Sequence, residues 1–344
     1  MKFLTLRADT LIRKCVIAVL ILLLLVSIPL LFSLRFLHSP VTTLHESITF
    51  EVAAGSSLSR VSLDLNQAGY LRYPLLFNLL AKWRGVEDAI KTGEYELIPG
   101  LTPAQLLTQL VRGDSLQYRI TLIEGWTFRQ ALDAIWQSDK IEKQLQSRSM
   151  AEIANLLSLD VDNPEGLLFP DTYFYTAGTS DIQLLQRASD RLEHVLATAW
   201  ETRLGALPYA SSYQALTLAS IIEKESAVGA ERGHIAGVFV RRLELGMRLQ
   251  SDPTVIYGMG ESYGGTIRSA DLSRVTPYNT YRIDGLPPTP IALPSMESIH
   301  ASLNPLPSGY LYFVAKGDGG HIFSSTLEEH NEAVNRYQRQ SAVQ

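Results

Sequence analysis

The chain has 344 residues with a formal net charge of −5, and 46 % of its residues are hydrophobic against 19 % charged. This composition excludes a disordered chain, and the acidic balance argues against a nucleic-acid binder, which needs a basic footprint. A single cysteine, Cys15, excludes an intramolecular disulfide and a thiolate-rich metal site, and the length suits a membrane anchor followed by two domains.

The first predicted element is a transmembrane helix at residues 15–34, where the run CVIAVLILLLLVSIPLLFSL contains no charge. A helix of this length spans about 30 Å, the thickness of the hydrocarbon core of a bilayer. Four basic residues precede the run and only Arg35 closely follows it, which predicts that residues 1–14 form a cytoplasmic tail. A cleaved signal peptide is the alternative, but no small-x-small cleavage site follows the run. We therefore expect an uncleaved, single-pass anchor.

A strand–turn–helix pattern then occurs three times, at Glu51–Ser57, Glu96–Thr102 and Thr121–Thr127. In each copy a β-like run ends at a glycine, and a Ser or Thr suited to cap a helix N-terminus comes two residues later. Apolar residues then recur at four-residue spacing, as on one face of a helix. A reused βα turn and a true duplication explain the pattern equally well.

The first two copies predict a small α/β module at residues 45–115, with strands near Ile48–Val52 and Gly93–Leu97. Its helices are expected near 57–67, 74–84 and 103–112. Residues 116–344 are expected to form a second, mixed domain with helices near 211–226 and 230–245, a hairpin at 310–324 and a C-terminal helix capped by Thr326. Six of the 16 prolines lie between Asp284 and Pro307, a density that excludes a helix and predicts a stiff, ordered loop.

Exclusion narrows the chemistry of the second domain. The sequence contains no paired histidine spacing such as H-x-x-x-H, no phosphate-binding loop and no G-x-S-x-G nucleophile motif. We therefore expect no metal and no cofactor, and carboxylate chemistry remains as the main enzymatic option.

The best candidate for that chemistry is Glu225 in the run Ala219–Ser226. On a helix, Glu225 shares the apolar face of Leu218, Ile221 and Ile222, so burial would raise its pKa toward the range of a general acid. Glu223 points elsewhere and is expected on the solvent side. The alternative is that both glutamates are ordinary solvated surface residues.

Three further segments are rich in hydrogen-bonding side chains: Gln250–Thr254, Tyr278–Tyr281 and Glu165–Tyr173. The last two also contain aromatic rings, and aromatic faces beside hydrogen-bonding side chains suit sugar rings. Taken one at a time, each is also explained by ordinary turn chemistry.

Four long motifs together resemble the endolytic murein transglycosylase family, MltG or YceG-like. They are Leu218–Gly260, Glu165–Tyr175, Thr276–Pro294 and Tyr310–Asn331, and the resemblance covers residues 45–340. It implies an α+β architecture: an inner-membrane anchor, a small LysM-like α/β module at 45–115 and a periplasmic α+β catalytic domain at 116–344. The module departs from a standard LysM repeat, so it either binds glycan or only spaces the second domain from the bilayer.

The same resemblance places the catalytic glutamate at Glu225, in agreement with the helical-face argument. We expect the groove around it to be lined by the substrate-binding residues Gln250, Asp252, Tyr278, Asn279 and His321. The implied substrate is the glycan strand of peptidoglycan, with peptidoglycan synthases as candidate partners and no nucleic acid. Cleavage between N-acetylmuramic acid and N-acetylglucosamine would leave a 1,6-anhydro end and terminate glycan elongation.

Two alternatives stay open at this stage. A lysozyme-type hydrolase would need a second carboxylate about 5–9.5 Å from the acid, for which Asp252 and Glu223 are the nearby candidates. A non-catalytic wall-binding anchor would bind the same strands and release no fragments.

Overall fold

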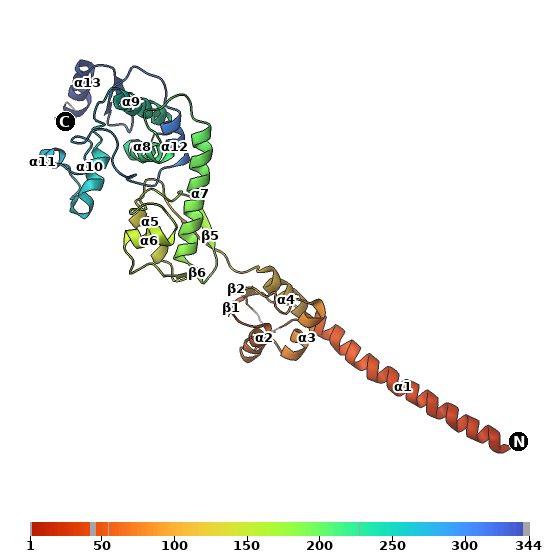
Figure 1. Ribbon diagram of the computed structural model, residues 1–344. Coiled ribbons are helices and arrows are strands. Elements are labelled where there is room, and N and C mark those ends of the chain that lie inside the picture. The colour runs from red at the N-terminus through yellow and green to blue at the C-terminus, as the bar shows by residue number, and fades with distance from the viewer. Residues whose placement is uncertain (1, 42–45, 54, 227, 340–344) are drawn as a thin grey trace. The chain divides into compact units, whose positions relative to one another are not determined.

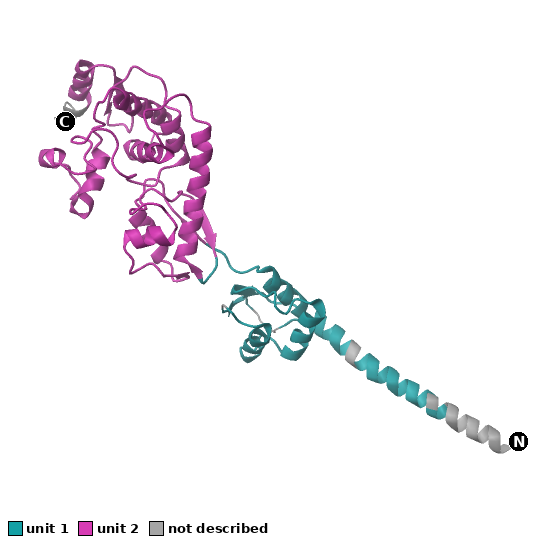
Figure 2. Ribbon diagram, viewed as in Figure 1, with its two compact units in different colours: residues 1–118, 176–178 teal, residues 119–175, 179–344 magenta. Residues whose placement is uncertain are grey.

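The structure is a computed structural model that describes residues 2–41, 46–53, 55–226 and 228–339 (Figure 1). It divides into two compact units (Figure 2). Unit 1 spans Met1–Tyr118 and Thr176–Gly178, and unit 2 spans Arg119–Tyr175 and Thr179–Gln344.

Unit 1 begins with α1 (Lys2–His38), which contains the predicted run at 15–34. Among the described residues, the stretch Val16–His38 is the one helix long and apolar enough to cross a membrane. The helix continues past that run, and Phe36 near its end is buried in the hydrophobic core of the following module. Backbone pairing continues the connection, because the Val41 amide donates to the Leu101 carbonyl oxygen at 2.7 Å.

The module contains β1 (Ile48–Val52) and β2 (Gly93–Leu97), which pair antiparallel with Ile48 opposite Leu97. Its helices are α2 (Leu58–Gln67), α3 (Pro74–Arg84) and α4 (Pro103–Arg112). Ser57 caps α2 and Thr102 caps α4 as the sequence pattern predicts, each by accepting a backbone N–H of the first turn. The predicted strands and helices of the module are confirmed.

The third copy of the pattern lies at the start of unit 2, after β3 (Tyr118–Thr121), whose first residue still belongs to unit 1. Its helix is α5 (Phe128–Trp136), capped by Thr127. Three short strands and a helix accompany it: β4 (Ile141–Glu142), α6 (Met150–Leu156), β5 (Thr172–Tyr175) and β6 (Thr179–Ser180). Strand β3 pairs with β5, and β4 pairs in parallel with β6. The turn after β3 is fixed to a distant segment, because the Gly125 amide donates to the Leu293 carbonyl at 2.8 Å and the Leu293 amide to the Trp126 carbonyl at 2.7 Å.

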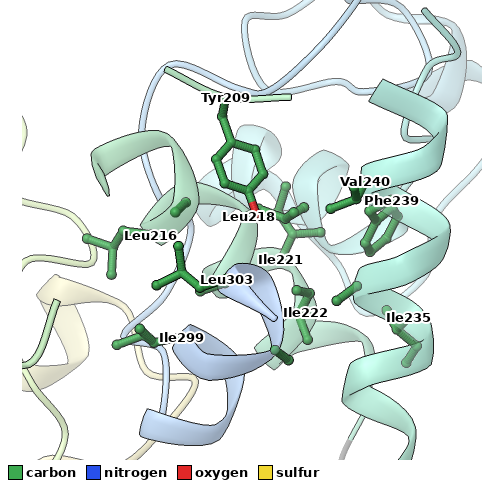
Figure 3. Packing of buried hydrophobic residues seen from close by; sticks show 14 of the residues in the cluster. Tyr209, Leu216, Leu218, Ile221, Ile222, Ile235, Phe239, Val240, Ile299 and Leu303 are labelled. Atoms are coloured by element: carbon green, nitrogen blue, oxygen red, sulfur yellow. The ribbon is translucent and has the colours of Figure 1, made fainter. Parts of the chain in front are cut away.

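The centre of unit 2 is α8 (Ser212–Glu225), against which α7 (Asp181–Glu201), α9 (Arg232–Glu244), α10 (Asp252–Met259) and α12 (Met296–Leu303) pack (Figure 1). Every residue from Ala215 to Ile222 is buried. Leu216, Leu218 and Ile222 lie among side chains of α9 and α12 (Figure 3). This stretch of α8 is therefore enclosed by its neighbours on all sides.

The remaining elements follow α8 in chain order. They are the 3₁₀ turns η1 (Gly229–Glu231) and η2 (Gly260–Ser262), the short helix α11 (Ser269–Ser273), the strands β7 (Tyr312–Ala315) and β8 (His321–Ser324), the helix α13 (Leu327–Val334) and the π-helical turn η3 (Asn335–Arg339). Strands β7 and β8 form the predicted antiparallel hairpin, with Ala315 opposite His321. Thr326 caps α13 as predicted.

The proline-rich segment contradicts the prediction of a loop throughout. Helix α12 lies between Pro294 and Pro305, which bracket a stretch long enough for two helical turns. Ser295 caps this helix by accepting the Ser298 amide. The prolines therefore bound the helix, and because none of them lies inside Met296–Leu303, they remove none of its backbone hydrogen bonds.

Candidate active site

Glu225 is the last residue of α8, and its carboxyl group lies partly buried at the edge of the unit 2 core. Burial is the main cause that raises the pKa of this carboxyl, and the nearby Asp252 also raises it, whereas a hydrogen bond from Ser251 and the charge of Arg242 lower it. The resulting pKa is about 7. The C-terminal end of a helix carries partial negative charge and also disfavours an anion there. Near neutral pH Glu225 is therefore both a competent proton donor and, once ionised, a competent acceptor.

The Ser251 hydroxyl donates to Oε1 of Glu225. Ser251 is the N-cap of α10, yet its side chain makes no capping hydrogen bond and serves the carboxyl instead. Its backbone is fixed by the Thr280 hydroxyl, which accepts the Ser251 amide at 2.9 Å. Gln250, just before it, has φ of 50°, a left-handed backbone that is rare outside glycine and concentrates at functional sites.

A cavity of about 430 Å³ opens in front of Glu225, within the usual size range of ligand pockets. Its walls come from the start of α10, from β7 and β8, and from α13. Aromatic rings of Tyr281, Tyr312 and Phe313 line it beside the polar groups of Gln250 and Asp252. Faces of aromatic rings next to hydrogen-bonding groups suit a sugar chain better than an apolar ligand.

Arg242 of α9 holds several parts of this wall together. Its Nε donates to the Leu311 carbonyl at 2.7 Å, and its Nη1 donates to the Leu249 carbonyl at 2.6 Å. The guanidinium carbon also lies 5.3 Å from the ring centroid of Tyr312. The arginine thus fixes the loop before α10 and the hairpin while placing a positive charge near Glu225.

Three of the five predicted substrate-binding residues, Gln250, Asp252 and His321, line the same cavity as Glu225. The carboxylate of Asp252 is exposed and accepts the Tyr281 hydroxyl at 2.7 Å. Burial, followed by this contact with Asp252, raises the pKa of the Tyr281 phenol, so it stays protonated as a donor at neutral pH.

His321 is oriented by Glu231, whose Oε2 lies 2.7 Å from the imidazole Nδ1. Burial alone would raise the pKa of Glu231, but the hydrogen bonds from the backbone and ring of His321 bring it below its usual value. The carboxylate is therefore ionised near neutral pH and fixes one edge of the ring.

The other two predicted residues lie elsewhere. Asn279 is buried, its side-chain amide donates to three carbonyls that include Arg274 at 2.6 Å, and its oxygen accepts the Tyr281 amide at 3.0 Å. Tyr278 packs against Tyr257 with ring centroids 4.8 Å apart. Both shape the loop that carries Tyr281 and do not line the cavity.

The prediction that Glu223 faces solvent is wrong, because its side chain is buried. Its side chain is 6 % exposed, and Oε1 lies 3.0 Å from Nη2 of Arg232. Oε2 accepts the Ser295 amide at 2.9 Å and the Ser298 hydroxyl at 2.7 Å. These partners lie 9 to 75 residues further along the chain, so local helical spacing gave no sign of them.

The sequence placed Glu165 in a candidate polar segment but gave no sign that it is a second buried carboxyl, whose pKa burial raises to about 7. It accepts the Phe128 amide at 2.8 Å at the start of α5, and the Tyr257 hydroxyl at 3.2 Å. It does not line the cavity of Glu225. A raised pKa alone therefore does not single out the acid, whereas the cavity does.

A larger cavity of about 710 Å³ lies between α7, α9 and α12. Glu297 is the one carboxyl among its described lining residues, and its side chain is 66 % exposed. It therefore lacks the burial that raises the pKa of Glu225. Among the residues that the structure describes, no group of three or more His, Cys, Asp or Glu side chains could hold a metal ion.

Comparisons with known proteins converge on one family. The profile of the YceG-like family matches residues 50–336. The endolytic murein transglycosylase of Bacillus subtilis (strain 168) is 30 % identical over 308 residues, which cover 85 % of each chain. That of Streptococcus pneumoniae serotype 2 (strain D39 / NCTC 7466) is 29 % identical over 321 residues, covering 83 % of this chain and 58 % of its own. The crystal structure of a YceG-like protein from Listeria monocytogenes matches with a TM-score of 0.53 and 31 % identity, covering 83 % of this chain and 98 % of that one.

Proposed function

The protein belongs to the YceG-like family. On this basis we propose that it is a lytic transglycosylase that cleaves glycan strands of murein at internal bonds. The observation that supports the proposal most directly is Glu225 at the edge of a cavity lined by aromatic and polar side chains, with a pKa of about 7. A carboxyl that is half-protonated at neutral pH can give a proton and later accept one.

In the proposed first step, neutral Glu225 protonates the glycosidic oxygen between N-acetylmuramic acid and N-acetylglucosamine. The bond from this oxygen to C1 of the muramic acid breaks, and positive charge develops on that sugar. The exposed carboxylate of Asp252, on the same cavity wall, is placed to stabilise this charge. Tyr281 orients that carboxylate by its hydrogen bond.

In the second step, the C6 hydroxyl oxygen of the same muramic acid forms a bond to C1. The ionised Glu225 accepts the proton that this hydroxyl loses. The product is a 1,6-anhydro end, no water is consumed, and Glu225 returns to its protonated state. Ser251 supports the ionised intermediate because its hydroxyl donates to the same carboxylate.

Mass analysis of the fragments tests the reaction. Full-length protein incubated with intact, undigested glycan strands should release internal fragments that carry 1,6-anhydro ends. Fragments with reducing ends, one water heavier, would instead identify a lysozyme-type hydrolase. Binding of strands with no release of fragments would identify a wall-binding anchor.

We further propose that α1 is a single-pass anchor in the cytoplasmic membrane, with residues 1–14 inside and the catalytic unit outside. Support comes from the apolar stretch Val16–His38 and from the basic residues that precede it. A reporter fused after Gln344 should be active only outside the cytoplasm, and activity inside would overturn this orientation. A LysM-like role for the module and partnership with peptidoglycan synthases belong to the same proposal.

A further inference from the structure

Helix α3 presents an apolar stripe to solvent. Leu75, Leu79 and Trp83 stand at i, i+4 and i+8, so they lie on one side of the helix, and they are 82 %, 61 % and 80 % exposed. The opposite side of the same helix holds Phe77 and Ala81, which are buried in the module core. Large apolar side chains that stay exposed on one side of a helix, while the other side is buried in the core, mark a site of contact with a membrane or with another protein.

The position of α3 next to α1 in unit 1 indicates that the membrane is the partner of this stripe. Tyr73, which immediately precedes α3, packs edge-on against Phe32 of α1 with ring centroids 5.5 Å apart. Phe32 lies within the stretch Val16–His38 and inside the apolar run that ends at Leu34. The first turn of α3 therefore begins at the level where α1 leaves the hydrocarbon core, a level at which tyrosine is enriched in membrane proteins.

The connection leaves the module little freedom to move away from that level. Phe36, before the end of α1, is already buried in the module core. The backbone amide of Val41 donates a hydrogen bond to the Leu101 carbonyl. Within the described stretch that ends at Val41, the candidate membrane span thus runs directly into residues packed in the module core.

The charged side chains of α3 itself, Lys82 and Arg84, are both basic. Helix α3 contains no acidic residue, and Lys82 stands on the exposed side between Leu79 and Trp83. At the junction with α1, Arg35 and Arg72 line a cavity of about 190 Å³. Basic side chains beside an apolar stripe are typical of helices that lie in the interface of an anionic bilayer.

We propose that α3 lies in the membrane interface, with Leu75, Leu79 and Trp83 inserted among the lipids and Lys82 directed to their headgroups. This inference rests on the proposed anchor, because the same bilayer must hold α1. It assigns the module a role in fixing the depth of the chain at the membrane, whether or not the module also binds glycan.

Quenching of tryptophan fluorescence by lipid tests the proposal. Full-length protein is placed in nanodiscs of phosphatidylethanolamine and phosphatidylglycerol, with acyl chains either plain or brominated. The signal of Trp83 is taken as the difference between wild type and Trp83→Phe, since the other three tryptophans remain in both. We expect this difference signal to be strongly quenched in brominated discs and retained in plain ones.

A matched pair of variants tests the stripe as a whole. Leu75→Ser combined with Leu79→Ser should relieve most of the quenching of Trp83. Leu63→Ser, which changes a leucine on α2 that is 43 % exposed, should leave the quenching unchanged. All three leucines are exposed, so none of these changes should unfold the module.

The outcomes separate this inference from the anchor on which it rests. Protein that does not stay with the discs during gel filtration would refute the anchor. Protein that stays with the discs while the Trp83 signal remains unquenched would refute the stripe alone, and would mark it as a surface for another protein or for glycan. Quenching that survives the double substitution would likewise contradict insertion of α3.

Discussion

Substitution of Glu225 by glutamine should lower activity and raise stability in the same protein. Glutamine keeps the shape of the side chain and removes the transferable proton. General acid–base catalysis contributes about 10²–10⁴-fold to a rate. Because the proposed mechanism uses Glu225 in both steps, we expect the loss of kcat on glycan strands to lie near the upper end of this range.

The stability effect follows from the raised pKa. A carboxyl with a pKa of 4.5 when unfolded and about 7 when folded favours the folded state less as pH rises between these values. Above pH 7 the accumulated cost is about 3 kcal/mol, since each pKa unit corresponds to about 1.4 kcal/mol. Glutamine has no charge to bury, so Glu225→Gln should gain about 3 kcal/mol over wild type at pH 8. Near pH 5, where the folded acid is still protonated, the gain should be below about 1 kcal/mol.

Glu165→Gln is the matched control, because burial raises the pKa of Glu165 to about 7 as well. Glutamine can still accept the Phe128 amide and can donate to the Tyr257 hydroxyl. This variant should therefore show a comparable pH-dependent gain in stability while its activity stays within a few-fold of wild type. Chemical unfolding of the full-length proteins at pH 5 and pH 8, together with initial rates, measures both. An active Glu225→Gln enzyme, or equal loss of activity in the two variants, would refute the assignment of the acid.

Two further substitutions address the groups around the acid. Ser251→Ala removes a hydrogen bond that lowers the pKa of Glu225, so the alkaline limb of the pH–rate profile, near pH 7 in wild type, should move up by roughly one pH unit. A profile of kcat/KM measures this shift, and an unmoved limb would contradict the role of the hydroxyl. Glu223→Gln should destabilise the protein by about 3 kcal/mol in chemical unfolding, because it removes the buried carboxylate partner of Arg232 and leaves, among the described residues, only the exposed Glu297, 3.8 Å away, beside that buried guanidinium. A variant as stable as wild type would show that this buried ion pair contributes nothing to the fold.

Local signals were sufficient for much of the fold. The capping residues Ser57, Thr102 and Thr127 each stand within four residues of the amide they accept, so the pattern that specifies each helix start is contained in a short stretch of sequence. Helix α12 was missed for a reason of the same local kind, since Ser295 is also a good N-cap and its signal was outweighed by the surrounding prolines.

The candidate site could be predicted only in part. Glu225 was identified by its place on an apolar helix, and Gln250, Asp252 and His321 by their motifs, and all four line one cavity. Ser251 was missed, because Ser-Asp-Pro is an ordinary helix start and nothing in the sequence shows its hydroxyl turning toward a residue 26 positions away. Distant partners, which only the tertiary fold supplies, decide such roles.

Three consecutive residues in the last turn of α8, Glu223 to Glu225, have three different roles. Glu223 ties the helix to α9 and α12, Lys224 donates to the Gly125 carbonyl at 3.1 Å, and Glu225 carries the proton. A transplant of this acid into another scaffold would therefore need more than one glutamate on a helix end. Without Arg232 and Ser295 to hold the helix two residues earlier, the grafted carboxyl would lack a fixed position, and its proton affinity would change with every repacking of the host.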